Sequence, residues 1–309
     1  MNLEKQLYKK FSVGIAMNTT LQEFSNLLET YGPYIDNFYG SLPLGDQYHG
    51  RTFIAQQFHD PEMQKKFWEI ARMINESGID LEIVFNTDGL IEDDLKECRD
   101  RLEKEKVAVN KIAVLDGYFD LVKELFPAAK VIDSVNNMKN TPEGFRGIRH
   151  SYDEIVIGRH FIRNAEVFRI VQEELHAKTV LLLNNGCSHV CGGCRTQQYC
   201  RDSYEKERAR YSAEYLYALQ SVMPYELHEG FFDLSHVDLF KLSTRNADTE
   251  FICKCLDSYI HNNAREYVEK SPHHYLLWSR LMWHMPYFDE FDYDRIYQLK
   301  KKICGYQDV

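Results

Sequence analysis

Several features that would place this chain in a familiar class are missing from its sequence. No apolar run approaches the roughly 20 residues of a membrane-spanning helix, and the opening residues Met1 to Gln6 are charged and polar, unlike a secretory signal. No Gly-x-Gly-x-x-Gly turn follows an apolar run, which counts against a dinucleotide-binding sheet. A His-Glu-x-x-His motif and a visible Ser/His/Asp arrangement are also lacking, so a peptidase is disfavoured. We therefore expect a cytoplasmic protein without a membrane anchor.

The composition sets broad limits on size and partners. With 309 residues, 44% of them hydrophobic, the chain can form one large α/β barrel or two ordinary domains. A net charge of −10 argues against nucleic-acid binding over the whole surface. The 20 Tyr and 18 Phe residues indicate stacking surfaces or a protein partner.

Short β-like runs alternate with longer helical patterns along the chain. Eight such runs predict a (β/α)8 TIM-type barrel over residues 1–262, with a doubly wound open sheet as the alternative. The aromatic-rich residues 263–309 predict a C-terminal helical extension, which either packs on the barrel or forms a surface for an oligomer or a heteromer. The predicted strands are Phe11–Met17, Ile35–Tyr39, Leu81–Phe85, Lys111–Leu115, Lys130–Val135, Glu154–Ile157, Lys178–Leu183 and Leu239–Leu242.

Between these strands, capping residues and apolar stripes predict the helices. Thr19 or Thr20 is the expected N-cap of the first helix, and the Asp60-Pro61 pair is expected to begin the second after a long loop at 42–51. The remaining expected helices are Ile91–Glu105, Asp120–Leu125, Ala165–Leu175, Ser203–Ser221 and Thr249–Ile260, with a weakly helical segment at Thr141–His150.

Four of the eight cysteines lie close together directly after the seventh predicted strand. Cys187, Cys191, Cys194 and Cys200 have the spacing C-x3-C-x2-C-x5-C on a Gly-containing loop. Four thiolates in so short a run can hold one compact soft-metal group, and a [4Fe–4S] cluster fits best. Disulfides, structural zinc and unligated cysteines are the alternatives, although zinc usually takes two knuckles separated by a longer loop. Cys253 or Cys255 could replace Cys200 as the fourth ligand, or be buried helix thiols like Cys98.

In such barrels the active site lies at the carboxyl ends of the strands, where this sequence has many polar residues. We expect Arg159, His160 and His49 to be catalytic, the histidines as acid–base groups. Asn and Asp at these ends often cap the next helix, so we interpret Asn18, Asn86, Asp88 and Asp116 as structural. The residues expected to bind substrate are Lys241 and Arg245, as clamps for a carboxylate or a phosphate, together with Asn136 and Asn185.

The spacing of Cys187, Cys191 and Cys194 after an apolar run resembles the signature of radical S-adenosylmethionine enzymes. That resemblance implies a cluster with one open iron that binds the cofactor S-adenosylmethionine. In those enzymes, however, the motif follows the first strand of the barrel, and here six predicted strands precede the one that leads into it.

A longer stretch is similar to the collagenase-like peptidase family of unassigned catalytic type, which includes UbiU, UbiV and RNA hydroxylation proteins. The matching pieces are Asp153–Arg159, the apolar strand that ends in a cysteine, and Leu239–Arg245, where Ser243-Thr244 replaces the family's Glu-Gly. The resemblance implies an iron–sulfur TIM barrel with oxygen-independent hydroxylation activity, in which Lys241 and Arg245 correspond by position. The family's cysteines are more widely separated than those here.

Taken together, these patterns predict an iron–sulfur-dependent oxidoreductase-like enzyme. Its expected substrate is a small anionic or nucleotide-linked molecule, and its expected partner is an electron donor protein. If only three cysteines bind the cluster, a radical S-adenosylmethionine mechanism becomes the alternative. A non-catalytic iron–sulfur or zinc module, with the aromatic tail as its interface, is the second alternative.

Overall fold

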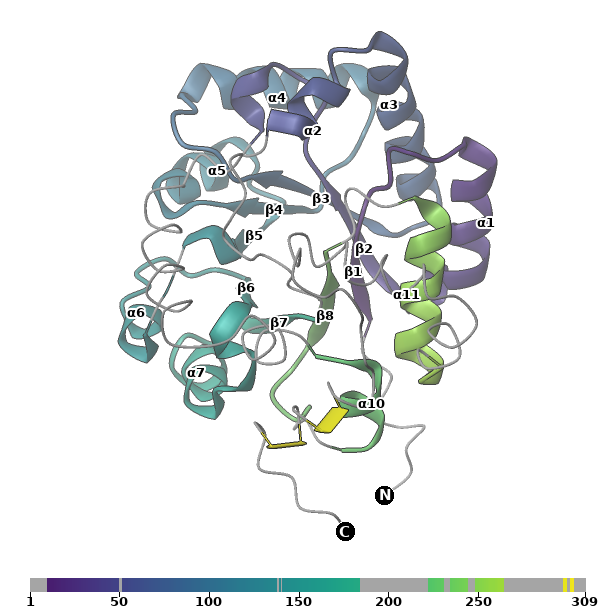
Figure 1. Ribbon diagram of the computed structural model, residues 1–309. Coiled ribbons are helices and arrows are strands. Elements are labelled where there is room, and N and C mark those ends of the chain that lie inside the picture. Colours follow the sequence, from purple (N-terminus) through teal and green to yellow (C-terminus); the bar gives the residue numbers. More distant parts are fainter. Residues whose placement is uncertain are drawn as a thin grey trace.

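Eight short strands, each with buried side chains, close into a parallel barrel in this computed structural model (Figure 1). The structure describes residues 10–49, 52–137, 139, 141–183, 222–230, 234–243, 248–263, 297–298 and 301–302. Within these ranges each strand pairs with its neighbours in sequence order, and β1 pairs with β8 to complete the circle. The strands are β1 (Phe11–Gly14), β2 (Ile35–Gly40), β3 (Asp80–Phe85), β4 (Lys111–Val114), β5 (Lys130–Asp133), β6 (Glu154–Ile157), β7 (Lys178–Leu182) and β8 (Leu239–Leu242).

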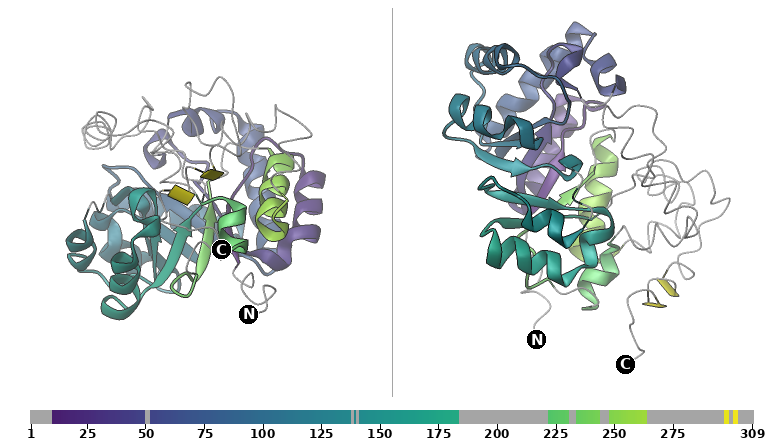
Figure 2. Two further views of the ribbon diagram at one scale, coloured as in Figure 1. Left: turned by 60° about the horizontal axis from the view of Figure 1, so that its bottom comes forward. Right: turned by 90° about the vertical axis from the view of Figure 1, so that its left-hand side faces the viewer.

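Helices cover the outside of this barrel. Helices α1 and α11 come from opposite ends of the described chain and pack side by side, because β1 and β8 are neighbours (Figures 1 and 2). The helices are α1 (Leu21–Tyr31), α2 (Thr52–Gln57), α3 (Pro61–Glu76), α4 (Glu92–Glu105), α5 (Phe119–Leu125), α6 (Pro142–Arg146), α7 (Ala165–Arg169), α10 (Pro224–His228) and α11 (Thr249–His261). Short 3₁₀ turns lie at η2 (Gly32–Tyr34), η3 (Asp46–Tyr48), η4 (Asp116–Tyr118), η5 (Val135–Asn137) and η6 (Arg159–Arg163), and a π turn at η7 (Ile170–Glu174).

The predicted barrel is confirmed, and the strand boundaries agree closely with the sequence pattern. The largest difference is at β1, which ends at Gly14 although the apolar run continues to Met17. Its neighbour β8 pairs only with Phe11, Ser12 and Val13, so the chain leaves the sheet soon afterwards. The apolar residues beyond β1 are still buried, which explains why the sequence does not mark the end of the strand.

The helix caps follow the expected chemistry. The Thr20 side chain accepts from the Glu23 N–H at 3.2 Å, and Glu23 accepts in return from the Thr20 N–H at 2.7 Å, which is a capping box. At α3, Asp60 accepts from the Glu62 N–H at 2.9 Å, and Pro61 occupies the first helical position. The sequence therefore fixes where these two helices begin.

Some elements differ from the sequence prediction or cannot be compared with it. Helices α2 and α10 were not predicted, because each is short and has no clear apolar stripe. The helix expected at 203–221 and most of the extension expected at 263–309 lie outside the described residues. Of that extension, Tyr297 packs edge-on against Tyr225 of α10, with ring centroids 4.8 Å apart. Within the described ranges, no helix has the length and apolar character needed to cross a bilayer.

Two apolar layers hold the barrel together. The larger lies between the strands and the helices and includes Phe11, Phe38, Leu81 and Phe240. The smaller fills part of the barrel interior, and its members are Tyr39, Val84, Ala113, Ile132, Val156, Val180, Leu182 and Leu239. Because side chains alternate along a strand, one set faces the helices and the other faces the barrel axis. The inward-facing set is incomplete, since polar residues occupy the remaining positions.

Candidate active site inside the barrel

Charged and polar side chains occupy the inward-facing positions that the apolar layer leaves. Contacts between β3 and β8, and between β4 and β6, join strands that are not neighbours in the barrel, so these contacts cross its interior. Ionised groups taken out of water are strongly destabilising unless they are paired. The buried residues are Ser12 (β1), Asn37 (β2), Glu82 (β3), Lys111 (β4), Glu154 (β6) and Lys241 (β8).

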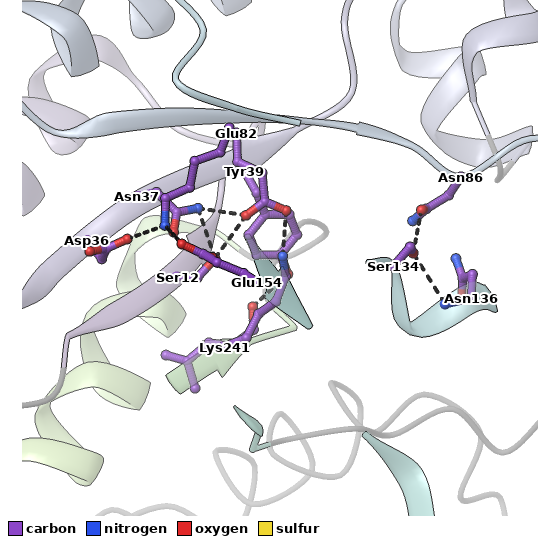
Figure 3. A network of polar contacts seen from close by, with 12 residues as sticks. Ser12, Asp36, Asn37, Tyr39, Glu82, Asn86, Ser134, Asn136, Glu154 and Lys241 are labelled. Carbon is purple, nitrogen blue, oxygen red and sulfur yellow. Dashed lines mark hydrogen bonds and ion pairs between the residues drawn. The ribbon is translucent and has the colours of Figure 1, made fainter. Parts of the chain in front are cut away.

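Glu82 is the centre of one group of contacts. Lys241 Nζ donates to Glu82 Oε1 at 2.6 Å, and Asn37 Nδ2 donates to Glu82 Oε2 at 2.8 Å (Figure 3). The Ser12 hydroxyl donates weakly to Oε2 at 3.4 Å and accepts from Asn37 at 3.0 Å. Both carboxylate oxygens are therefore hydrogen-bonded, which is what a buried anion requires.

Tyr39 on β2 completes this group on the other side of Lys241. The Lys241 ammonium lies 4.1 Å from the centroid of the Tyr39 ring, within the range of a cation–π interaction. The Tyr39 hydroxyl donates to the Leu242 carbonyl at 2.6 Å, and this bond fixes the ring against the end of β8. We call Ser12, Asn37, Tyr39, Glu82 and Lys241 the Lys241 cluster.

A second group, the Lys111 cluster, consists of Asp36, Lys111 and Glu154. Lys111 Nζ lies 2.6 Å from both Asp36 Oδ2 and Glu154 Oε1. Burial alone would lower the pKa of Lys111, but the carboxyl groups of Glu154 and Asp36 raise it above its ordinary value. The two clusters are contiguous, because Lys111 is the register partner of Glu82 and Asp36 precedes Asn37 in the chain.

At the carboxyl ends of β3 and β5, hydrogen bonds connect three polar residues. The Ser134 hydroxyl donates to Asn86 Oδ1 at 2.7 Å and accepts from the Asn136 N–H at 3.2 Å (Figure 3). Asn86 therefore links two strand ends. The sequence interpretation expected it to cap the next helix, but the residue at the N-cap of α4 is Ile91. Asn136, expected to bind substrate, lies half-buried in this connection at the predicted end of the barrel.

Asp133 and Lys139 form a separate structural cluster beside these residues. Lys139 Nζ lies 2.7 Å and 2.9 Å from the two Asp133 oxygens, and Asn137 also donates to Asp133. Asp116 accepts from the Tyr152 hydroxyl at 2.7 Å, and burial together with this bond raises the pKa of Tyr152 well above its usual range. The Asp116 N–H donates to Asn137 Oδ1 at 2.9 Å, and this bond ties the segments after β4 and β5 together, which agrees with a structural role for Asp116.

His49, expected to be catalytic, is buried in the segment after β2. Its ring stacks on Phe58 with centroids 5.3 Å apart. A ring packed in this way is shielded from solvent, and its acid–base role stays a prediction. The backbone of Arg159 and His160 begins η6 at the carboxyl end of β6, as expected, and their side chains lie outside the described part of the structure.

The last turn of η6 is attached to α10. The Arg163 guanidinium lies 2.6 Å from Glu226 Oε1, and Glu226 is fully buried. The other Glu226 oxygen accepts from the Met223 N–H at 2.6 Å. This ion pair connects the segment after β6 to the segment that leads into β8.

Most of the residues expected to bind metal or substrate are not among those described. Cys187, Cys191, Cys194, Cys200, Asn185 and Arg245 all lie outside the described ranges. Cys98 and Cys255 are buried helix thiols, and burial raises the pKa of both; Cys253 is half-buried. In the part of the chain that is described, no group of three or more His, Cys, Asp or Glu is arranged to hold a metal ion.

Sequence reasoning found Lys241 but missed its partners. Ser12, Asn37, Glu82, Lys111 and Glu154 were not expected as site residues, although each belongs to a predicted strand or its flank. The available signal was a charged residue at an inward position of an apolar strand, as in Leu81-Glu82-Ile83. Chemically, the Lys241 cluster presents a fixed ammonium group inside a closed barrel.

Comparisons with known proteins give similarity in fold only. No family model matches the sequence, and no curated protein matches it. The U32 peptidase Mk0906 is 13% identical with a TM-score of 0.44, over 76% of this chain and 93% of that one. The carboxyl transferase domain of Rhizobium etli pyruvate carboxylase, solved with pyruvate, is 11% identical with a TM-score of 0.39; the match covers 84% of this chain and 48% of that one. The (β/α)8 class itself is defined by the strand order and register.

Proposed function

We propose that this barrel is an enzyme whose cofactor is a [4Fe–4S] cluster held by Cys187, Cys191, Cys194 and Cys200. Four thiolates are the donor set that such a cluster takes. The proposed chemistry is a redox reaction, of the hydroxylation type or related to it, on a small anionic or nucleotide-linked substrate. An electron donor protein would supply the reducing equivalents.

The observation that carries this proposal is where the cysteine-containing segment leaves and rejoins the barrel. Leu183 directly follows β7, and its N–H donates to the Lys241 carbonyl at 3.0 Å. The Val222 N–H donates to the Leu183 carbonyl at 2.8 Å, so the chain returns to the point from which it left. The Tyr259 hydroxyl also donates to the Val222 carbonyl at 2.7 Å. Leu183 and Val222, the described residues on either side of positions 184–221, thus lie together at the carboxyl end of β7, where barrel enzymes have their active sites.

Chain length adds a limit that is independent of conformation. Cys187 is four residues beyond Leu183, and a fully extended chain of that length spans at most about 14 Å. This limit supports a cofactor at the mouth of the barrel over one at the opposite end.

When bound, the cluster would supply electron transfer, and the residues of the barrel would hold the substrate beside it. Lys241 is the described candidate for this task. The Glu82 carboxylate accepts a hydrogen bond from its ammonium group, and the Tyr39 ring limits the directions in which that group can move. Arg159 and Arg245 are the further cations that we propose for an anionic substrate.

Anaerobic purification followed by iron and sulfide analysis tests the proposal. We expect iron and acid-labile sulfide in near-equal amounts in the wild-type protein and in Cys253→Ser, a matched control on α11 outside the motif. Zinc in place of iron in anaerobically prepared protein would contradict the proposal and favour a zinc module.

The Cys200→Ala variant then separates two mechanisms. Loss of the cluster in this variant indicates a four-thiolate site that transfers electrons. A cluster that persists, with a spectrum that S-adenosylmethionine perturbs, indicates a radical enzyme with one open iron. Either result refines the site without depending on the identity of the substrate.

A further inference from the structure

Among the described residues of the barrel interior, the charges do not balance if every group is ionised. Asp36, Glu82 and Glu154 contribute three carboxyl groups to the contiguous clusters, whereas Lys111 and Lys241 contribute two ammonium groups. Glu82 and Glu154 are 1% and 2% exposed, so neither has water to stabilise an uncompensated negative charge. One additional proton would make this interior neutral.

Two hydrogen-bonding atoms in the same interior are also unsatisfied. Asn37 Oδ1 and Glu154 Oε2 are both buried, and neither has a hydrogen-bond partner within the described part of the chain. Both atoms are acceptors while Glu154 is ionised, so they cannot bond to each other. Buried polar atoms without partners are rare in proteins and need an explanation.

The surroundings of each carboxyl group indicate where the extra proton lies. Glu82 accepts from Lys241, Asn37 and Ser12, so donors already occupy both of its oxygens. Asp36 pairs with Lys111 and is 33% exposed on its side chain, so water stabilises its charge. Glu154 shares Lys111 with Asp36 and has a single donor, on Oε1.

We propose that the barrel contains a proton-binding site at Glu154, whose Oε2 carries the proton at neutral pH. The proton balances the three carboxyl groups against the two ammonium groups. It also changes Glu154 Oε2 from an unpaired acceptor into a donor, and Asn37 Oδ1 is an acceptor that needs one, directly or through one buried water. One proton thus accounts for the charge excess and for the unpaired Oε2 atom of Glu154.

Burial and the neighbouring carboxyl groups also favour the protonated form of Glu154. Burial raises the pKa of Glu154 above its ordinary value against the opposing effect of Lys111, and the nearby Glu82 and Asp36 charges raise it further. The adjacent strands β5 and β7 begin with Lys130 and Lys178, which are exposed to solvent and so are screened from the interior. The site does not involve the cysteines, and it stands whether or not a cluster binds.

Infrared spectroscopy of the intact protein tests this inference, because a protonated carboxyl group has a carbonyl band that shifts in D₂O. We expect this band at pH 7 in the wild type, and its loss in Glu154→Gln. Asp133→Asn is the matched control, because burial also raises the pKa of Asp133. Should Glu154→Gln not fold, Glu154→Asp keeps an acid on a shorter side chain and is expected to shift the band.

Two results would overturn the inference. The first is a wild-type spectrum at pH 7 without a protonated-carboxyl band. The second is a band that Glu154→Gln and Glu154→Asp leave unchanged, or that only Asp133→Asn removes. Raising the pH of the folded wild type gives an independent check, since the band must disappear reversibly while the protein remains folded.

Discussion

The Lys241 cluster and the Lys111 cluster contain the same kinds of residue, but they differ in the number of hydrogen-bond donors around the buried glutamate. In the Lys241 cluster, Glu82 has three hydrogen-bond donors, and one of them is the ammonium group of a lysine that it does not share with another described carboxyl group. In the Lys111 cluster, Glu154 has one donor and shares its lysine with Asp36. Both glutamates are almost completely buried. The comparison teaches that two carboxyl groups with the same burial can differ in the number of donors that stabilise them.

Removing the charge of Glu82 is expected to have the largest effect. Glu82→Gln leaves the Lys241 ammonium without its carboxylate inside the barrel, and breaking a buried pair in this way costs about 3–5 kcal/mol of the free energy of unfolding. Urea unfolding at pH 7 measures this loss. The double variant Glu82→Leu/Lys241→Met removes both charges, so it should be more stable than Glu82→Gln. A loss below about 1 kcal/mol in the single variant would mean that the pair is not truly desolvated.

Lys111→Met should have an intermediate effect that depends on pH. Asp36 can return to water because it is partly exposed, and Glu154 can remain protonated, so we expect a loss of about 2 kcal/mol at pH 5. Without Lys111 the pKa of Glu154 is raised further, and a raised pKa destabilises the folded state as pH increases towards it. The loss should therefore be larger at pH 8. Equal losses at both pH values, from urea unfolding, would contradict this account.

Ser12→Ala tests the weakest donor in the Lys241 cluster. The Ser12 hydroxyl lies 3.4 Å from Glu82 Oε2 and accepts from Asn37 Nδ2. In the variant, Asn37 Nδ2 still donates to Glu82 Oε2. We expect the free energy of unfolding to fall by about 1 kcal/mol, as for an ordinary buried hydrogen bond. Thermal melts of Ser12→Ala and Glu82→Gln, measured under the same conditions, compare the two losses of stability. A loss as large as that of Glu82→Gln would contradict the view that Ser12 is a minor donor in this cluster.

Glu154→Gln is expected to have the smallest effect, because glutamine resembles a neutral carboxylic acid. The change in the free energy of unfolding at pH 5 should stay within about 1 kcal/mol. Burial raises the pKa of Glu154 in the folded state, so the unfolded state ionises first as pH rises above 4.5 and wild-type stability falls. Between pH 5 and pH 8 the variant should therefore gain stability relative to the wild type. A loss comparable to that of Glu82→Gln would show that Glu154 is ionised.

The course of the chain was largely predictable from local patterns. The strand from Glu154 to Ile157 and the caps at Thr20 and Asp60 were found because each depends on residues close together in the sequence. The five-residue helix α10 was not, since so short a helix is held by tertiary contacts such as that between Arg163 and Glu226. Local sequence thus predicts long periodic elements better than short ones.

The interior clusters could not be predicted in the same way. Glu82 and Lys241 are 159 positions apart, and only the closure of the barrel brings them together. Lys111 and Glu154 stand at the first positions of their strands, where charged residues are usually exposed. Lys241 was singled out as a substrate-binding cation, which stays a prediction, and its pairing with Glu82 depends on the strand register across the interior.

The most direct test of the proposed function is the iron content of two cysteine variants purified anaerobically. Cys194→Ser removes a thiol of the proposed cluster, whereas Cys253→Ser removes a half-buried thiol on α11. We predict that the wild type and Cys253→Ser contain iron and acid-labile sulfide, and that Cys194→Ser has lost most of both. Equal iron in the two variants, or a wild-type protein that binds zinc and no iron, would contradict the proposal.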